Sequence, residues 1–439
     1  MKKNKAVSVL LALFVCATAA FAQGTLADRY RAGMLPRFVE YAKVASQSDN
    51  DAEWMTPGQE EMAQILYKDI QAFGFPTYLS KDKYIYVNIP SNLKGRKAPV
   101  LGISAHYDTT PDIIGYGIKP QVIKNYNGKP ITLKNGHVID FKTDPYLQKM
   151  IGKTIVTSDG TTMLGADDKA GVTIVTTLIK TLAENPDMPH GQIQLVITPN
   201  EDVGRSAERL DLNYYHPDYA FDFDGGCDGE VIVANFSADR IVVTAKGVNG
   251  HQSYAKENGY RNSADPIALV TRLVARKHNL PNYSEGEQGY IEPHHISYNA
   301  KDNTHSVDFR FRYFNQNDGK RWMNRLNRAV KYAEQKFGVE IEVQAVKQYE
   351  NVANGVKAEA MQLIDNAMKA AGVKPNYKKE RAGTTSAMIM AKHGFGGYTV
   401  FTGQNNPHNF TEWLSEEDMF KGYKVALNLV TQTAQMTVK

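Results

Sequence analysis

The hydrophobic pattern of the chain alternates between short apolar runs and longer segments of helical periodicity. The apolar runs that are typical of strands cover residues 84–89, 99–105, 192–198, 218–223 and 397–402. Helical periodicity marks residues 26–44, 58–73, 168–183 and 357–371, and a further helix is expected after residue 383. Strands that alternate with helices predict an α/β fold built on a mixed sheet.

The pattern changes between about residues 236 and 350. Strands are predicted at 240–246, 290–298, 304–314 and 339–346, with helices at 265–277 and 321–337. This β-α-β-β-α-β order is typical of a ferredoxin-like unit with its own core. We therefore expect a catalytic domain formed by residues 23–235 and 353–439, with a lid domain inserted at 236–352.

Residues 112–151 contain repeated turn signals and little apolar periodicity. A loop this long inside a compact domain is usually functional. The segment is therefore predicted to hold a hairpin and to form an insertion that faces the substrate.

The N-terminus has the pattern of a signal peptide. A basic start precedes an apolar stretch at residues 6–19, and Ala20-Phe21-Ala22 fits the small-x-small cleavage pattern. We therefore predict a signal peptide at residues 1–22, cleavage near Ala22 and an exported protein, either periplasmic or secreted. Its removal leaves Cys227 as the only cysteine, so no internal disulfide is expected.

The amino-acid composition limits the classes of partner that the protein is expected to bind. The 439 residues are 42% hydrophobic and 22% charged, with a formal net charge of +4, which is ordinary for a globular protein. No cluster of Lys and Arg interleaved with aromatic residues indicates a nucleic-acid partner. Once the signal peptide is removed no membrane contact is expected, and the chain could be a monomer or a homodimer.

Several predicted strands end in residues that bind metals. The acids and histidines at these positions, together with one carboxylate before the helix at 168–183, are His106, Asp108, Asp167, Glu201, Asp202, Asp224 and His408. In open α/β sheets, ligands bind beyond the carboxyl ends of the strands, so these side chains are expected to converge. Histidine with Asp and Glu suits divalent ions, zinc first.

The spacing of these residues suggests roles. His106 and Asp108 leave a strand end on the same face, which places Asp108 to orient the imidazole. Adjacent acids after a buried strand are consistent with Asp202 as a ligand and Glu201 as the general base for the attacking water. Asp167 could bridge two ions. Each feature alone is more often an ordinary loop, but all of them together favour a metal site.

Four motifs resemble those of the co-catalytic zinc exopeptidases, and within them the peptidase T (tripeptide aminopeptidase) family. They are Ser104-Ala105-His106-Tyr107-Asp108-Thr109, residues 164–171, residues 198–204 and Asp224-Gly225-Gly226. The segment at 120–126 is also similar to peptidase T. The resemblance extends, in the same order, over essentially the whole chain after residue 22.

The resemblance implies two zinc ions, with cobalt or manganese as substitutes. By position, Asp167 would bridge them, His106 and Asp224 would complete one site, and Asp202 and His408 would complete the other.

It also implies the remaining roles. Glu201 falls at the position of the general base and Asp108 at that of the residue that orients the first histidine. His251 matches a histidine that assists at the substrate carbonyl, and Arg312 matches an arginine that faces the substrate carboxylate. Short peptides would be the substrates.

The chain departs from the family at three places. Asn200-Glu201-Asp202 stands where the family has Asp-Glu-Glu, residues 382–387 lack an aspartate, and residues 407–412 match loosely. The sequence thus favours a dizinc aminopeptidase that removes the N-terminal residue from short peptides, preferentially tripeptides. A related deacylase or carboxypeptidase-like amidohydrolase, and a non-catalytic peptide-binding homologue, are the alternatives.

Overall fold

The computed structural model describes residues 26–248 and 250–437, and its largest element is a mixed sheet of eight strands. In sheet order these are β1 (Thr77–Leu79), β2 (Ile85–Ile89), β8 (Ile193–Thr198), β3 (Leu101–His106), β9 (Tyr219–Gly225), β16 (Gly397–Phe401), β10 (Glu230–Asn235) and β15 (Asn376–Glu380). Strands β8, β3, β9 and β16 run parallel, whereas β2 and β10 run antiparallel to their neighbours β8 and β16. The prediction of a mixed α/β fold is confirmed.

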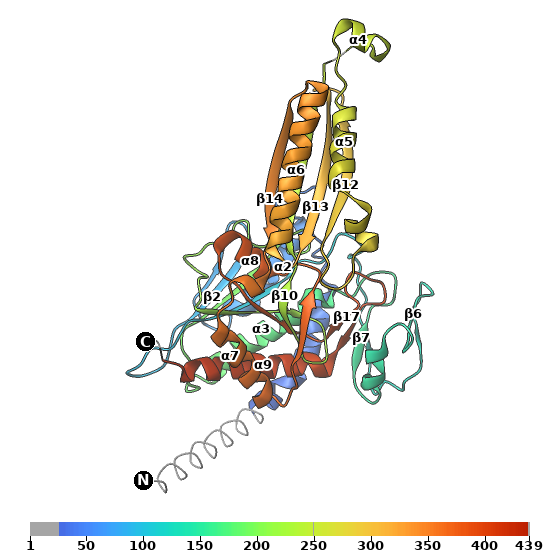
Figure 1. Ribbon diagram of the computed structural model, residues 1–439. Helices are drawn as coiled ribbons and strands as arrows, with labels where there is room; N and C mark the ends of the chain where they lie inside the picture. Colours follow the sequence, from blue (N-terminus) through green and yellow to red (C-terminus); the bar gives the residue numbers. More distant parts are fainter. Residues whose placement is uncertain (1–25, 249, 438–439) are drawn as a thin grey trace, which may run out of the picture.

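Helices pack on this sheet. The central one, α3 (Ala166–Glu184), lies against β3, β9 and the C-terminal helix α9 (Glu416–Gln435), and α7 (Ala358–Ala370) packs on α9 (Figure 1). Helix α3 is buried over most of its length because it is enclosed between the sheet and α9, and the hydroxyls of its buried threonines bond to its own backbone. A helix at residues 26–43, α2 (Pro57–Gln71) and α8 (Thr385–His393) complete this part.

Local signals set the ends of these helices. Thr56 accepts a hydrogen bond from Gln59 N, and Pro57 occupies the first turn of α2, where its missing N–H costs nothing. Ser415 caps α9 in the same way, and Glu416, Glu417 and Asp418 in its first turn complement the helix dipole.

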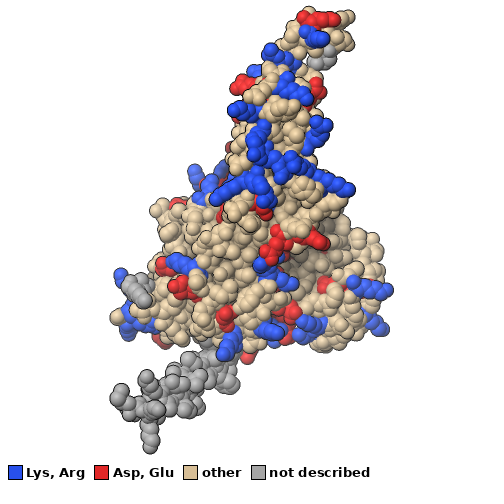
Figure 2. Space-filling model, in the orientation of Figure 1, with Lys and Arg blue, Asp and Glu red and all other residues tan. Residues whose placement is uncertain are grey.

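A four-stranded antiparallel sheet projects from the body, with two helices on one face (Figure 1). The order along the chain is β11 (Ser237–Lys246), α5 (Ala264–Val274), β12 (Tyr290–Asn299), β13 (Thr304–Tyr313), α6 (Gln316–Phe337) and β14 (Ile341–Tyr349). This is the predicted β-α-β-β-α-β order, and Val243, Val270, Phe309, Phe311 and Leu326 belong to its separate core. Figure 2 shows Lys and Arg side chains gathered on this projecting part.

Residues 112–151 are more ordered than the sequence indicates. The predicted hairpin is present as β5 (Ile131–Thr132) and β6 (Val138–Ile139). A further strand, β4 (Gln121–Ile123), joins a small sheet with β7 (Ile155–Thr157), β18 (Trp413–Ser415) and β17 (Gln404–Asn405). A 3-10 helix, η1 (Pro145–Met150), lies beside this sheet, and Trp413 Nε1 donates to Asp144 Oδ2 at 2.5 Å. The insertion is thereby tied to the segment that follows His408.

Among residues 26–248 and 250–437, no helix has both the length and the apolar character that crossing a membrane requires. The signal peptide predicted for residues 1–22 lies outside the described residues.

Candidate metal centre and active site

The predicted ligands meet at one edge of the large sheet. His106 is the last residue of β3, and Asp224 is the last but one residue of β9. Asp202 lies in the loop after β8. Asp167 stands at the start of α3, and His408 lies in the loop between β17 and β18. Parallel strands bring their carboxyl ends to the same edge, which explains why residues so distant in sequence converge.

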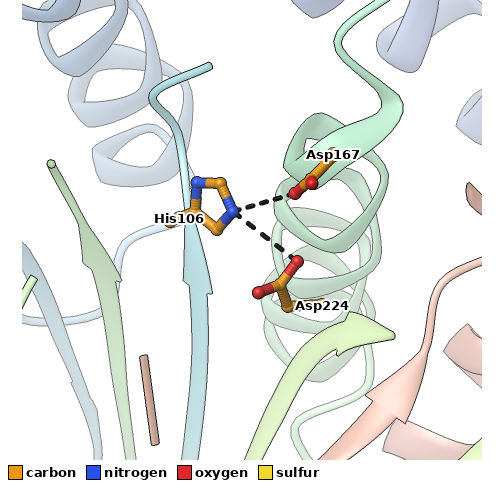
Figure 3. A group of neighbouring side chains, drawn as sticks. All are labelled: His106, Asp167 and Asp224. Carbon is orange, nitrogen blue, oxygen red and sulfur yellow. Dashed lines mark hydrogen bonds and ion pairs between the residues drawn. The ribbon is translucent and has the colours of Figure 1, made fainter. Parts of the chain in front are cut away.

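Asp167 stands between the two histidines. Its Oδ1 lies 3.0 Å from His106 Nε2, whereas its Oδ2 lies 3.3 Å from His408 Nε2. Asp224 Oδ1 lies 3.5 Å from His106 Nε2 (Figure 3), and Asp202 Oδ1 lies 2.8 Å from His408 Nε2. Among the described residues, three groups have ligand atoms close enough to hold an ion. Two of them, His106–Asp167–Asp224 and Asp167–Asp202–His408, share Asp167, and the third joins His106, Asp108 and Asp202.

The electrostatics of the cluster suit cations. Burial raises the pKa of Glu201 and of Asp224 well above the usual range and raises that of Asp202 to about 6. Burial opposes protonation of His408, but hydrogen bonds to Asp167 and Asp202 raise its pKa to about 12. Positive charge close to these crowded acids is therefore favourable, and Asp202 Oδ2 is buried with no hydrogen-bond partner among the described residues. Imidazole nitrogens with carboxylate oxygens fit two divalent ions of the zinc, cobalt or manganese type.

Asp108 connects the two halves of the cluster. It is fully buried, and its Oδ1 lies 3.3 Å from His106 Nδ1. The same carboxylate accepts hydrogen bonds from Glu201 N at 2.9 Å and from Asp202 N at 3.2 Å. It therefore lies beside the imidazole, and it holds the backbone that carries Glu201 and Asp202, which the sequence did not indicate.

Glu412 holds the backbone around Asp167. It is 1% exposed, and it accepts hydrogen bonds from Leu164 N at 2.8 Å, Gly165 N at 2.7 Å and Asp167 N at 3.0 Å. In the sequence, Glu412 is simply an acid four residues after His408. Its hold on the backbone before α3 depends on a contact across more than 240 residues, which no local pattern reveals.

Two of the departures from the family pattern have structural roles. Asn200 has φ +56°, a left-handed conformation that Asn tolerates well, and its Nδ2 donates to Trp54 O at 2.5 Å. A carboxylate could not make that bond. In residues 382–387, Thr384 caps α8 and Ser386 N donates to Asp222 Oδ2 at 3.2 Å, so the segment serves the start of a helix.

A cavity of about 540 Å³ opens beside the cluster. Asp167, Glu201, Asp202, Asp224 and His408 all line it. Its other walls come from the segments around residues 225–232, 380–384 and 404–407. The proposed ligands and the candidate base therefore face one shared space.

The two predicted substrate residues lie differently. Arg312 on β13 lines a smaller neighbouring cavity together with Glu201 and Asp202, and its Nη2 donates to Gln348 Oε1 at 3.3 Å. His251 is exposed and precedes η2 (Gln252–Tyr254) at the tip of the projecting part (Figure 1). The structure does not bring His251 to the cluster within one chain, because the β-strands of the projecting part separate its tip from the body.

Comparisons with known proteins fit this geometry. The family model described as Peptidase family M20/M25/M40 matches residues 154–432. The chain belongs to this peptidase family. Peptidase T of Halothermothrix orenii is 33% identical over 408 residues, covering 91% of this chain and 98% of the relative. Peptidase T of Shewanella sediminis is 31% identical, covering 92% of this chain and 99% of the relative. The resemblance to peptidase T seen in the motifs is confirmed.

Solved structures share the fold. The aminopeptidase PepT from Bacillus cereus aligns with a TM-score of 0.68 at 20% identity, covering 92% of this chain and 99% of that one. A dinuclear metal-binding peptidase of the M20 family from Bacillus subtilis aligns with a TM-score of 0.61 at 14% identity, with the same coverage.

The comparisons contradict the predicted export. The peptidase T relatives, which match this chain over nearly their whole length, are cytoplasmic enzymes. The apolar N-terminal stretch resembled a signal peptide by composition alone, and the prediction of an exported protein is therefore wrong by this comparison.

Proposed function

We propose that the protein is a two-metal aminopeptidase that removes the N-terminal residue from short peptides, preferentially tripeptides. The observation that carries the proposal is the pair of ligand groups that share Asp167 and face one cavity with Glu201. The peptidase T relatives and the family membership support it.

In this proposal Asp167 would be a ligand of both of two zinc ions. His106 and Asp224 would help to hold one ion, and Asp202 and His408 would help to hold the other. Cobalt or manganese would serve as substitutes, since the same donor types accept them. Such ions, when bound, polarise the scissile carbonyl and make the attacking water more acidic.

Glu201 is the proposed general base. Its burial, which raises its pKa, makes the carboxylate a better proton acceptor than an exposed glutamate. It takes the proton of the attacking water and later delivers it to the leaving amine. Asp108 fixes the position of Glu201 through the bond to the Glu201 backbone N–H.

The proposed substrate contacts include Arg312 for the peptide carboxylate. Its guanidinium lies over the Tyr349 ring at 5.2 Å and donates to the neutral side chain of Gln348. A carboxylate would add a charge-assisted pair there. Because Arg312 stands on β13, residues 236–352 would act as a lid domain over a catalytic domain formed by residues 23–235 and 353–439.

A metal analysis combined with a peptide panel tests the proposal. Purified enzyme should hold two divalent ions per chain and cleave Met-Gly-Gly after its first residue. The acetylated peptide should be nearly inert and longer peptides should be poorer substrates. Efficient hydrolysis of N-acetyl amino acids, with free tripeptides untouched, would replace the proposal with the deacylase alternative.

A further inference from the structure

The proposed reaction needs a site for the substrate α-ammonium, and the cavity wall beyond Asp224 has the right chemistry. Covalent geometry places the α-nitrogen only about 2.5 Å from the carbonyl carbon that is attacked. The ammonium must therefore lie within the same cavity, close to the ligand cluster, against groups that accept hydrogen bonds.

Gln404 supplies a free acceptor at that place. Its Nε2 donates to Asp224 O at 3.0 Å and to Asp224 Oδ1 at 3.3 Å, and these two acceptors fix which end of the amide is nitrogen. Its Oε1 is buried without a partner among the described residues, although the residue is only 5% exposed and lines the cavity. A buried acceptor without a donor is costly, so a donor group from a ligand is expected there.

Glu230 supplies the charge. It begins β10, which runs antiparallel to β16, so it lies at the same edge of the sheet as Asp224. Its Oε1 accepts one long hydrogen bond, 3.4 Å from Gly226 N, and no described Lys, Arg or His lies within ion-pair distance. Burial raises the pKa of this carboxyl, and the charge of Lys378, which is not within ion-pair distance, offsets that rise only in part.

The charged residues that line the cavity also favour binding of a positively charged group. Two divalent ions would balance the four acids of the cluster, Asp167, Glu201, Asp202 and Asp224. Two further acids, Glu230 and Glu380, line the same cavity, whose lining contains no Lys or Arg. Glu380 pairs opposite Asn235, at the far end of β10 from Glu230, and its Oε1 already accepts from Arg381 N at 2.7 Å. Of these two acids, Glu230 is the one at the Asp224 edge of the sheet, and only one long hydrogen bond holds its carboxylate.

We propose that Glu230 and the Gln404 side-chain oxygen bind the free α-ammonium of the peptide substrate and so make the enzyme specific for unblocked N-termini. This assignment rests on the proposed aminopeptidase function. The sequence motifs do not indicate which residues bind this ammonium.

Binding to an inactive enzyme tests it. The metal-loaded Glu201→Gln variant is titrated by calorimetry with Met-Gly-Gly and with its desamino analogue, in which hydrogen replaces the ammonium. Adding Glu230→Gln should weaken binding of Met-Gly-Gly about 10- to 100-fold, because a charge-assisted hydrogen bond is lost. Binding of the desamino analogue should change less than about threefold, and Glu230→Asp should recover part of the loss.

Glu380→Gln is the matched control, since it removes the same charge from the same cavity. It should affect the free tripeptide less than about threefold. An equal loss in both variants would assign the effect to the general field of the cavity and overturn the specific role of Glu230. So would an unchanged preference for the ammonium in Glu230→Gln. A parent enzyme that binds metal but never cleaves free tripeptides would instead refute the aminopeptidase function itself.

Discussion

Glu412 offers the sharpest test of how the bridging ligand is held. Its two oxygens accept three backbone N–H groups, from Leu164, Gly165 and Asp167, at 2.7–3.0 Å. Glu412→Ala leaves all three donors without an acceptor in the protein interior. Glu412→Gln keeps one oxygen, which can serve two of them, but its amide nitrogen then faces the third N–H.

The expected loss of stability can be worked out from these hydrogen bonds. A hydrogen bond to a charged group contributes about 1.5–3 kcal/mol, so the three bonds together set an upper limit near 5–9 kcal/mol. Burial of Glu412 raises its pKa to about 7, so removing the carboxylate also relieves a desolvation cost. We therefore expect Glu412→Ala to lower the free energy of unfolding by about 3–5 kcal/mol and Glu412→Gln by about 2 kcal/mol. Affinity for both metals should fall about 10- to 100-fold, because Asp167 is shared.

Urea unfolding of the metal-free protein and zinc titration against a competing chelator measure the two effects. Glu416→Gln is the matched control. Glu416 lies four residues away and accepts from Arg31 at 2.8 and 3.0 Å near the surface, where such pairs contribute about 1 kcal/mol or less. Its loss should leave metal affinity unchanged. If Glu412→Ala kept the stability and both metal affinities of the wild type, the support assigned to Glu412 would be refuted.

Three further predictions concern catalysis. Glu201→Gln should keep both metals and lower kcat about 10²–10⁴-fold, which is the usual contribution of a general base. Asp202→Ala should instead lower metal occupancy. A fully active Glu201→Gln enzyme would show that Glu201 is not the general base. Arg312→Ala should raise KM for free tripeptides much more than for their C-terminal amides, and equal damage to both would assign the arginine another role. Chelation should abolish activity and lower the melting temperature, with zinc or cobalt restoring both; active enzyme with metal content near zero would contradict the metal dependence.

Much of the site could be predicted because its ligands follow strands. His106, Asp202, Asp224 and His408 each come after an apolar run, and parallel strands align their ends whatever the loops between them do. The supporting contacts could not be predicted in this way. Glu412 and Gln404 act through hydrogen bonds to distant segments, and neither lies in a motif with its own spacing.

Several elements of the fold are not among those predicted from the hydrophobic pattern. Strand β15 reads Asn-Tyr-Lys-Lys-Glu and lies at the exposed edge of the sheet, so it lacks the apolar alternation that marks a strand. Strand β10 is apolar but short, and it comes soon after the turn at Cys227, so it is not among the predicted strands. Helix α9 is not among the predicted helices either, although the Ser415 cap and three acids in its first turn are signals of a helix start.

Most of the groups that hold the ligand segments are not themselves proposed ligands. Asp108 holds the backbone of Glu201 and Asp202, Glu412 holds that of Asp167, and Gln404 holds Asp224. These bonds join protein groups to one another, so the protein itself contributes to the geometry of both ligand groups. Binding metal therefore requires little ordering of the chain, and the binding energy is available to offset the repulsion between crowded acids. This explains why the site can combine four neighbouring carboxylates with a fixed shape. It also predicts that substitutions at Asp108 and Glu412 change metal affinity and catalysis together, since each moves ligands rather than removing them.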